Sequence, residues 1–232
     1  MELSKRLKFI ADKIDKCESI IDVGTDHGYI PIYAVKNNLC NKAIASDINK
    51  DPVKKAKLNA SLEGVGKEVD VRLGGGLETV KINEVDGVII AGMGGNLIRD
   101  ILEKDMEKVE KYKFLILQPA QNPEVLREYL YNNNYEIITE DLCFDEGIFY
   151  ELFKVKFSKE KQIDNLTMDS YEFSPVLIKD KHHLMFEYLE SKEAKYKKIL
   201  GFIKDDTDSA KERKADIERK IELIDKLKEE VR

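Results

Sequence analysis

The sequence predicts an α/β fold in which a mostly parallel sheet with an antiparallel edge is followed by a C-terminal helical hairpin of coiled-coil type. Short apolar runs alternate with helical patterns through the first half of the chain, which is typical of parallel strands joined by helices. Two long strand-like runs then follow each other directly, and no strand pattern returns beyond residue 158. These observations divide the 232 residues into a sheet domain over 1–157, a linker over 158–175 and a helical hairpin domain over 176–232.

Several short apolar runs, each bounded by turn residues, are predicted to be parallel strands. The run DGVIIAG is typical of a central strand that is buried on both faces. In chain order, the predicted strands span residues 19–24, 42–47, 68–73, 86–92 and 113–119.

Helical patterns lie before and between these strands. A first helix is expected from Ser4, as its N-cap, to Lys16, because apolar residues recur there at helical spacing. Asp51 and Pro52 have the residue types of an N-cap and a first helical position, and this helix is expected to end near Gly64.

The end of the sheet and the C-terminal segment have different patterns. The runs YEIITEDLCF and IFYELFKVKF, joined by Asp145, Glu146 and Gly147, predict a β-hairpin at the sheet edge. After the polar residues 158–175, apolar residues recur near heptad spacing in two charged segments. The stretch DDTDS separates these segments, so we expect them to form antiparallel helices.

The stretch IIDVGTDHGYIP, residues 20–31, has the pattern of the strand, tight turn and helix that open a Rossmann-like site. Gly24 permits a sharp turn. A dinucleotide site would read G-x-G-x-x-G, whereas this loop reads G-T-D-H-G, and its carboxylate would repel a pyrophosphate. It would attract a cation such as S-adenosylmethionine, with Asp22 or Asp26 near the ammonium or sulfonium group. Alternatively, Asp26 only caps the next helix.

Other residues at the carboxyl ends of the predicted strands are expected to reach the same crevice. Asp47 follows the glycine turn by about 20 residues, a spacing that suits an acid binding ribose hydroxyls, although it could also be a plain turn residue. The glycines of LGGGLE either approach a flat ring or form a flexible loop. In AGMGG, Met93 could contact a base or belong to the core.

Composition limits the classes of protein that fit. No apolar run is long enough to span a membrane, and the N-terminal MELSKRLKFIADK mixes charges unlike a signal peptide. A net charge of −6 argues weakly against nucleic-acid binding by total charge, although local patches can still bind phosphates. Three scattered cysteines without metal-type spacing fit a reducing cytoplasm and predict no metal site.

Several stretches occur in a specific order: LSKRL from Leu3, DVGTDHGYIP from Asp22, AGMGG from Ala91 and LILQP from Leu115. Together they resemble the bacterial tRNA adenine-N1 methyltransferases that act on adenine 22 of the D-loop, over essentially the whole chain. The resemblance implies a class I S-adenosylmethionine-dependent methyltransferase fold, a coiled-coil-like C-terminal domain and tRNA as partner. We expect a cytoplasmic monomer or weak dimer with no metal and no membrane contact.

The resemblance also implies roles for individual positions. Gly24, Asp26 and His27 would lie at the methionine end of the cofactor and Asp47 at its ribose. Gly92 and Met93 would face the reacting centre. The family commonly has an acid where Gly75 stands, so another group must contact the cofactor's adenine. The residues expected to bind S-adenosylmethionine are Asp22, Gly24, Thr25, Asp26, His27, Asp47, Ile48, Gly74, Gly75, Ala91, Gly92 and Met93.

Adenine N1 carries an in-plane lone pair and is a nucleophile when neutral, so the site mainly has to align it with the methyl group. AGMGG lacks the Asn/Asp-Pro-Pro-aromatic motif that usually accompanies amino-group methylation, which favours a ring nitrogen. Asp26 could stabilise the cationic product. The candidate catalytic residues are Asp26, His27, Tyr29 and Gln118, and the last three could instead be packing, cofactor-contacting or backbone-satisfying residues.

The candidate tRNA contacts are Lys5, Arg6, Met93 and Gly94. The helical hairpin domain also carries the stretches KYKK and KERK, although lysines interleaved with glutamates usually form a solvated helix face. Two alternative functions remain open at this point: a methyltransferase for a small molecule or protein, and a non-catalytic module that binds nucleic acid.

Overall fold

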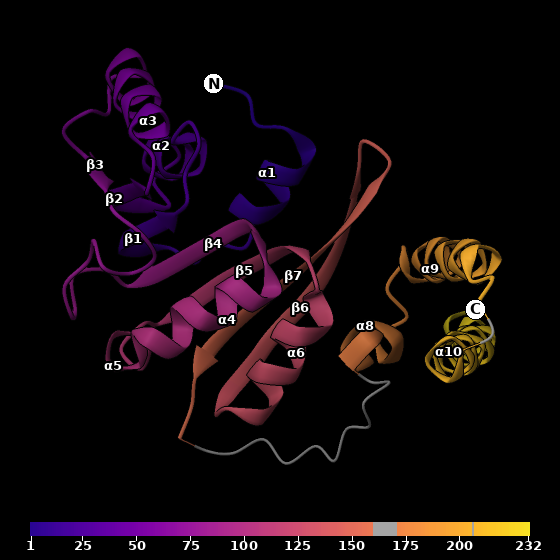
Figure 1. Cartoon of the computed structure of the whole chain (residues 1–232). Coiled ribbons are helices and arrows are strands. Elements are labelled where there is room, and N and C mark those ends of the chain that lie inside the picture. The colour runs from indigo at the N-terminus through magenta and orange to yellow at the C-terminus, as the bar shows by residue number, and fades with distance from the viewer. Residues whose placement is uncertain (160–170, 206) are drawn as a thin grey trace. The chain divides into compact units, whose positions relative to one another are not determined.

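The structure is a computed structural model of the chain, and it describes residues 1–159, 171–205 and 207–232. The chain divides into two compact units, Met1–Asn165 and Leu166–Arg232, each with its own secondary structure (Figure 1). Most of the predicted linker, 158–175, lies outside the described residues.

The first unit is built on a 7-stranded sheet in the order β3-β2-β1-β4-β5-β7-β6. β1 to β5 are parallel, and β7 runs antiparallel to both β5 and β6, as predicted. The direction of chain progression reverses between β1 and β4, where open α/β sheets bind ligands at the carboxyl ends of strands. The strands are β1 (Cys17–Val23), β2 (Cys40–Asp47), β3 (Val69–Leu73), β4 (Gly87–Gly94), β5 (Phe114–Gln121), β6 (Tyr135–Asp145) and β7 (Ile148–Phe157).

Helices cover both faces of the sheet (Figure 1). Successive side chains in a strand point to opposite faces, so Ile89 and Ile90 of β4 belong to two separate apolar clusters. The cluster of Ile89 includes residues of α1 (Lys5–Ala11), α2 (Tyr29–Lys36) and α3 (Lys50–Leu62). The cluster of Ile90 includes residues of α4 (Gly95–Lys104), α5 (Met106–Val109) and α6 (Pro123–Asn132).

The predicted β-hairpin is confirmed. β6 and β7 pair antiparallel up to Asp145 and Ile148. Glu146 and Gly147 form the turn with φ values of 48° and 81°. Positive φ at both central residues is the geometry that matches a two-residue turn to the twist of the strands.

The first helix is shorter than predicted. The Ser4 hydroxyl accepts a hydrogen bond from the Leu7 N–H at 3.3 Å, which confirms Ser4 as the cap. The helix ends at Ala11 rather than Lys16. The Ile14 N–H donates to the Ala11 carbonyl at 3.1 Å, a tighter turn that leads the chain toward β1 with Ile14 buried.

The third helix begins earlier than predicted. Its N-cap is Asn49 and not Asp51, and Pro52 lies within the first turn rather than at the first position. The Asp47 carboxylate accepts the Asn49 N–H at 2.6 Å, which closes the turn before Asp51 is reached.

The second unit is helical, with α8 (Pro175–Lys179), α9 (Met185–Phe202) and α10 (Asp208–Val231). Lys228 near the end of α10 pairs with Glu193 in the first half of α9, so the two long helices are antiparallel, as predicted. The Glu172 carboxylate accepts from Lys192 and Lys220, each at 3.4 Å, and ties both helices to the segment before α8.

Candidate functional site

A cavity of about 320 Å3 lies at the carboxyl edge of the sheet, where β1 and β4 meet. Its volume is within the range of small-molecule sites. We call it the β1–β4 cavity. It is lined by Arg6, Leu7, Asp22, Gly24, Thr25, Asp26, His27, Tyr29, Ile30, Ala91 and Gly92. The structure therefore brings together most of the residues that the sequence predicted for the methionine end of the cofactor.

The loop after β1 requires glycine at its first turn. Gly24 has φ of 77°, and a Cβ atom there would lie 2.2 Å from Met93 Cε. The N–H groups of Gly24 and Thr25 donate to the Ser46 carbonyl at 2.8 and 2.9 Å, which anchors the loop to β2. The Gly28 N–H then donates to the Thr25 hydroxyl at 3.2 Å. Hydrogen bonds from backbone N–H groups therefore fix this loop at its start, Gly24 and Thr25, and at its end, Gly28.

The side chain of Asp26 does not cap the next helix. The N-cap of α2 is Gly28, and no side chain accepts a capping hydrogen bond there. The Asp26 side chain is 71% exposed, and its carboxylate lies 3.1 Å from His27 Nε2. The His27 ring stacks on Tyr29 with centroids 5.1 Å apart and planes 7° from parallel. The mouth of the cavity thus presents a carboxylate beside two stacked rings.

Asp22 is the buried carboxylate of the cavity. It is 6% exposed and lies in β1 between β2 and β4. Burial raises its pKa to about 6, from an ordinary value of 3.8. A hydrogen bond from Thr25 and the positive charge of Arg6 lower the pKa, and the Asp47 carboxylate raises it further. A bound cation would keep such a group ionised at neutral pH.

Arg6 extends from α1 to the opposite wall of the same cavity. Its Nε donates to Gln118 Oε1 at 2.7 Å, and its guanidinium lies 5.2 Å from the centroid of the Tyr150 ring. Gln118 is fully buried and its Nε2 donates to the Pro119 carbonyl at 2.8 Å. Gln118 therefore lies behind Arg6 and not among the lining residues, so the expected contact between Gln118 and a target base gives way to a contact with Arg6.

The end of β4 is irregular. The pairing of β4 with β5 shifts register between Ala91 and Met93, so Gly92 bulges out with φ of 80°. Ala91 and Gly92 line the cavity, whereas Met93 is half-buried against the core on the α4 side. The end of the Met93 side chain packs against Gly24, where a Cβ atom would lie 2.2 Å from Met93 Cε.

The residues predicted for the ribose and adenine of the cofactor gather at the ends of β2 and β3. The Gly74 N–H donates to the Asp47 carbonyl at 2.9 Å. Ile48 is 72% exposed, and a Cβ atom on Gly75 would lie 3.7 Å from its Cδ1. Gly75 lines a separate hollow of about 250 Å3 together with Leu97. These residues adjoin one another but do not line the β1–β4 cavity.

Sequence reasoning missed the apolar wall of the cavity. Leu7 and Ile30 both line it, and neither is among the residues expected to bind the cofactor. Their positions inside LSKRL and inside TDHGYIP were the available signal. Three predicted tRNA contacts, Lys5, Met93 and Gly94, are not among the lining residues.

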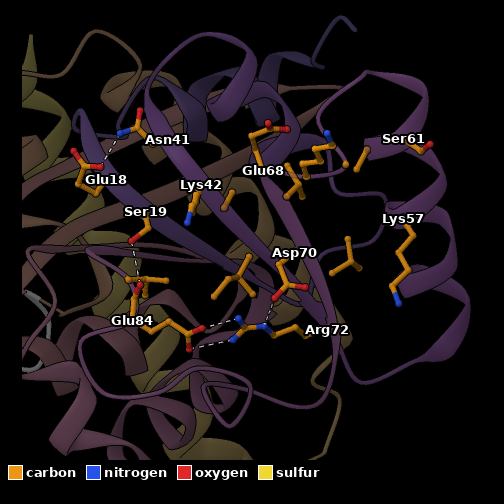
Figure 2. A pocket seen from close by; sticks show the side chains of 18 residues that line it. Glu18, Ser19, Asn41, Lys42, Lys57, Ser61, Glu68, Asp70, Arg72 and Glu84 are labelled. Carbon is orange, nitrogen blue, oxygen red and sulfur yellow. Dashed lines mark hydrogen bonds and ion pairs between the residues drawn. The ribbon is translucent and has the colours of Figure 1, made fainter.

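A larger hollow of about 1040 Å3 lies elsewhere in the first unit (Figure 2). Its residues come from the amino-terminal parts of β1 and β2, most of β3, the second half of α3 and the segments before β3 and β4. The ends of β1 and β2 that line it are opposite to the edge where open α/β sheets bind ligands. Some of its charged side chains have partners within the hollow: Arg72 contacts Asp70 at 2.7 Å and Glu84 at 2.6 Å, and the Asn41 amide donates to Glu18 at 2.6 Å. The hydrogen bond from Arg72 lowers the pKa of Glu84 to about 2. The position of this hollow at the other end of the strands leaves the β1–β4 cavity as the better candidate site.

Among residues 1–159, 171–205 and 207–232, no three His, Cys, Asp or Glu side chains are grouped so that they could hold a metal ion. In the same ranges, no helix has the length and apolarity needed to cross a membrane.

Comparison with known proteins gives a consistent result. The family model TrmK, described as tRNA (adenine(22)-N(1))-methyltransferase, matches residues 20–226. The chain is 32% identical to the tRNA (adenine(22)-N(1))-methyltransferase of Bacillus subtilis (strain 168) over 230 residues, which are 97% of this chain and 96% of the relative.

Solved structures of similar proteins also match this chain over nearly its full length. TrmK of M. capricolum in complex with S-adenosyl-homocysteine has a TM-score of 0.84 and 32% identity, covering 100% of both chains. Sp1610 of Streptococcus pneumoniae in complex with S-adenosyl-L-methionine has a TM-score of 0.87 and 29% identity, covering 98% of this chain and 100% of the other. These likenesses and the strand order confirm the class I methyltransferase fold. Because both the family model and the Bacillus subtilis relative cover most of its length, the chain belongs to the TrmK tRNA (adenine(22)-N(1))-methyltransferase family.

Proposed function

We propose that this chain transfers a methyl group from S-adenosylmethionine to N1 of adenine 22 in the D-loop of tRNA. Family membership supports the activity. The structural observation that carries it is the β1–β4 cavity, in which the buried Asp22 and the exposed Asp26 adjoin a positive-φ glycine turn. Two carboxylates at this turn disfavour a pyrophosphate and favour a cationic ligand.

The residues present fit S-adenosylmethionine, which supplies a methyl group on a positively charged sulfur and also carries an ammonium group. Asp22 is 6% exposed and forms no ion pair within the described residues, so an ammonium group would be its natural counter-ion. Asp47 suits ribose hydroxyls, and the exposed Ile48 beside Gly74 and Gly75 suits a flat ring. The backbone of Gly24, Thr25, Ala91 and Gly92 completes the proposed donor site, with His27 at its mouth and Met93 behind it.

The methyl transfer needs little general-base catalysis. Adenine N1 is a nucleophile when neutral, so the protein mainly aligns N1 with the donor, which can lower the barrier by several kcal/mol. N1 lies on the Watson–Crick edge, so the base must be unpaired or swung out of its stack. Tyr29 and His27, stacked at the cavity mouth, are positioned to receive the base. The Asp26 carboxylate then stabilises the cationic ring of the product.

Other parts of the proposal rest on sequence position. Lys5 is exposed on the helix that carries Arg6, and it is proposed to contact tRNA together with Gly94 and the lysine-rich stretches of α9 and α10. A cytoplasmic monomer or weak dimer stays part of the proposal.

The proposal is tested by methyl transfer to unmodified tRNA, with Asp26→Ala as the decisive variant. We expect its rate to fall by about 100-fold or more, which is typical when an electrostatic group is removed from a site. The midpoint of urea unfolding should stay unchanged, because the Asp26 side chain is 71% exposed. Asp51→Ala is the matched control, since that carboxylate is 84% exposed and lies on α3. Normal methylation by Asp26→Ala would refute the assigned role of this loop.

A further inference from the structure

The β-hairpin formed by β6 and β7 separates from the sheet before it turns. β7 pairs with β5 only as far as Phe153, which lies opposite Leu117. Its pairing with β6 continues to Ile148, opposite Asp145. Because β7 runs antiparallel to β5, the separated part of the hairpin projects at the carboxyl edge of the sheet (Figure 1). We call the segment Phe144–Phe149 the hairpin tip.

The hairpin tip lies beside the β1–β4 cavity. The backbone N–H of Arg6 donates to the Asp145 carboxylate at 2.9 Å. The guanidinium of Arg6 lies 5.2 Å from the centroid of the Tyr150 ring, one residue beyond the tip. Arg6 is itself a lining residue of the cavity. Both contacts therefore place the tip next to the wall of the cavity that is proposed to receive the target base.

The hairpin tip presents apolar side chains on both of its faces. Phe144 is 39% exposed and Ile148 is 53% exposed. Phe144 shares a face with Phe149, which lies directly opposite on β7, and their ring centroids are 4.6 Å apart. Ile148 shares the other face with Tyr150, toward Arg6, because side chains two residues apart in a strand point the same way. The turn is thus flanked by one exposed apolar side chain on each face.

The charge of the hairpin distinguishes nucleobases from phosphates as its contact on RNA. Residues 139–153, TEDLCFDEGIFYELF, contain five acids and no lysine or arginine. Such a segment repels a phosphate backbone, whereas the uncharged faces of bases pack well on aromatic side chains. A base that leaves its stack to enter a cavity exposes the faces of its neighbours. Phe and Ile are among the side chains that proteins insert between bases as wedges.

We propose that the hairpin tip is a wedge for the tRNA. Phe144 and Ile148 pack against the bases on either side of adenine 22 and fill the space that the adenine leaves when it swings into the β1–β4 cavity. This inference rests on the proposed function, since it takes adenine 22 as the target. The wedge acts on the use of tRNA and leaves the binding of the methyl donor unchanged.

The direct test is the full-length double variant in which Phe144→Ala is combined with Ile148→Ala. We expect its kcat/KM for unmodified tRNA to fall by about tenfold or more, as when a base loses its stacking partner. Its affinity for S-adenosylmethionine in calorimetry and its unfolding midpoint should equal those of the wild type. Phe144→Leu combined with Ile148→Val keeps the tip apolar and should retain most of the activity. Ile138→Ala is the matched control, because that side chain is 43% exposed on β6 at the end of the strand away from the tip.

Synthetic tRNAs that lack the base before or after adenine 22 separate a wedge from a structural role. On at least one of them, the difference between the wild type and the double alanine variant should shrink to about twofold or less, because the two changes remove the same contact. The inference is overturned if the loss is equal on the intact tRNA and on both of these RNAs, or if donor affinity falls by the same factor as activity. Wild-type activity in the double alanine variant would contradict the inference alone, whereas a wild type that leaves adenine 22 unmethylated would contradict the proposed function.

Discussion

Replacement of Asp22 by asparagine should make the protein more stable at neutral pH while it weakens donor binding. Asp22 is 6% exposed, and burial raises its pKa to about 6 from an ordinary value of 3.8. The folded state therefore holds the proton more tightly than the unfolded chain does. Stability from this proton is fully present below about pH 4 and is lost as the pH rises to about 6. The difference between the two pKa values corresponds to about 3 kcal/mol.

Asparagine keeps the shape of the side chain and cannot ionise. We expect Asp22→Asn to exceed the wild type in free energy of unfolding by up to about 3 kcal/mol at pH 8, and to match it near pH 4. Donor affinity at pH 7 should fall by about tenfold or more, because the counter-ion of the ammonium group is gone. Urea unfolding at both pH values and calorimetric titration with S-adenosylmethionine measure the two effects.

Asp51→Asn provides the comparison, because that carboxylate is 84% exposed and its replacement should alter neither quantity. The reasoning is refuted if Asp22→Asn is less stable than the wild type at pH 8, or if its effect on stability does not change between pH 4 and pH 8. Unchanged donor binding in this variant would refute the assignment of Asp22 to the ligand.

Further substitutions test the packing around and beyond the site. Arg127→Met leaves two carboxylates, which are 1% and 6% exposed, without their guanidinium partner. Urea unfolding should show that this variant loses about 3–5 kcal/mol of unfolding free energy, whereas Arg99→Met, which breaks a more exposed pair, should lose less than about 1 kcal/mol. Equal losses in the two variants would contradict this reasoning. Gly24→Ala puts a Cβ atom 2.2 Å from Met93 Cε at a residue whose φ is 77°. This variant should lose at least about 1–2 kcal/mol of unfolding free energy and should bind the donor more weakly. Stability and donor affinity equal to those of the wild type would contradict this expectation. Gly75→Asp has room for its Cβ, 3.7 Å from the nearest atom, and should tighten donor binding about tenfold by accepting from the adenine amino group; calorimetry showing no gain would remove Gly75 from the adenine site.

Local pattern was enough to predict most of the fold. Apolar runs bounded by turn residues located the parallel strands, and Asp145-Glu146-Gly147 located the hairpin because a short stretch ending in glycine separates two long strand-like runs. Helix ends were less predictable. They depend on single hydrogen bonds, such as that from the Asn49 N–H to Asp47, which no periodicity reports.

The candidate site was predictable where the residues that build it are close in sequence. The loop from Asp22 to Tyr29 lines one side of the β1–β4 cavity, and its chemistry could be predicted from the acids between its glycines. The opposite side was not predictable in the same way. Arg6 meets Gln118 across 112 residues of sequence, so only the folded chain shows that this predicted tRNA contact also lines the cavity.

Arg127 illustrates the same limit in the core. An arginine on an amphipathic helix is normally solvated, yet this side chain is fully buried between Glu140 of β6 and Glu151 of β7. The pairing depends on how α6 packs on the antiparallel edge, which no local pattern encodes.

The most direct test is the position and identity of the methyl group on RNA. An unmodified tRNA transcript would be incubated with the protein and S-adenosylmethionine, cut with nucleases and analysed by fragment mass, beside a transcript in which guanosine replaces adenine 22. We predict one added methyl group in the D-loop fragment of the first transcript, present as 1-methyladenosine, and none in the second. Methylation of both transcripts, methylation at another base, or a different methylated nucleoside would contradict the proposed activity.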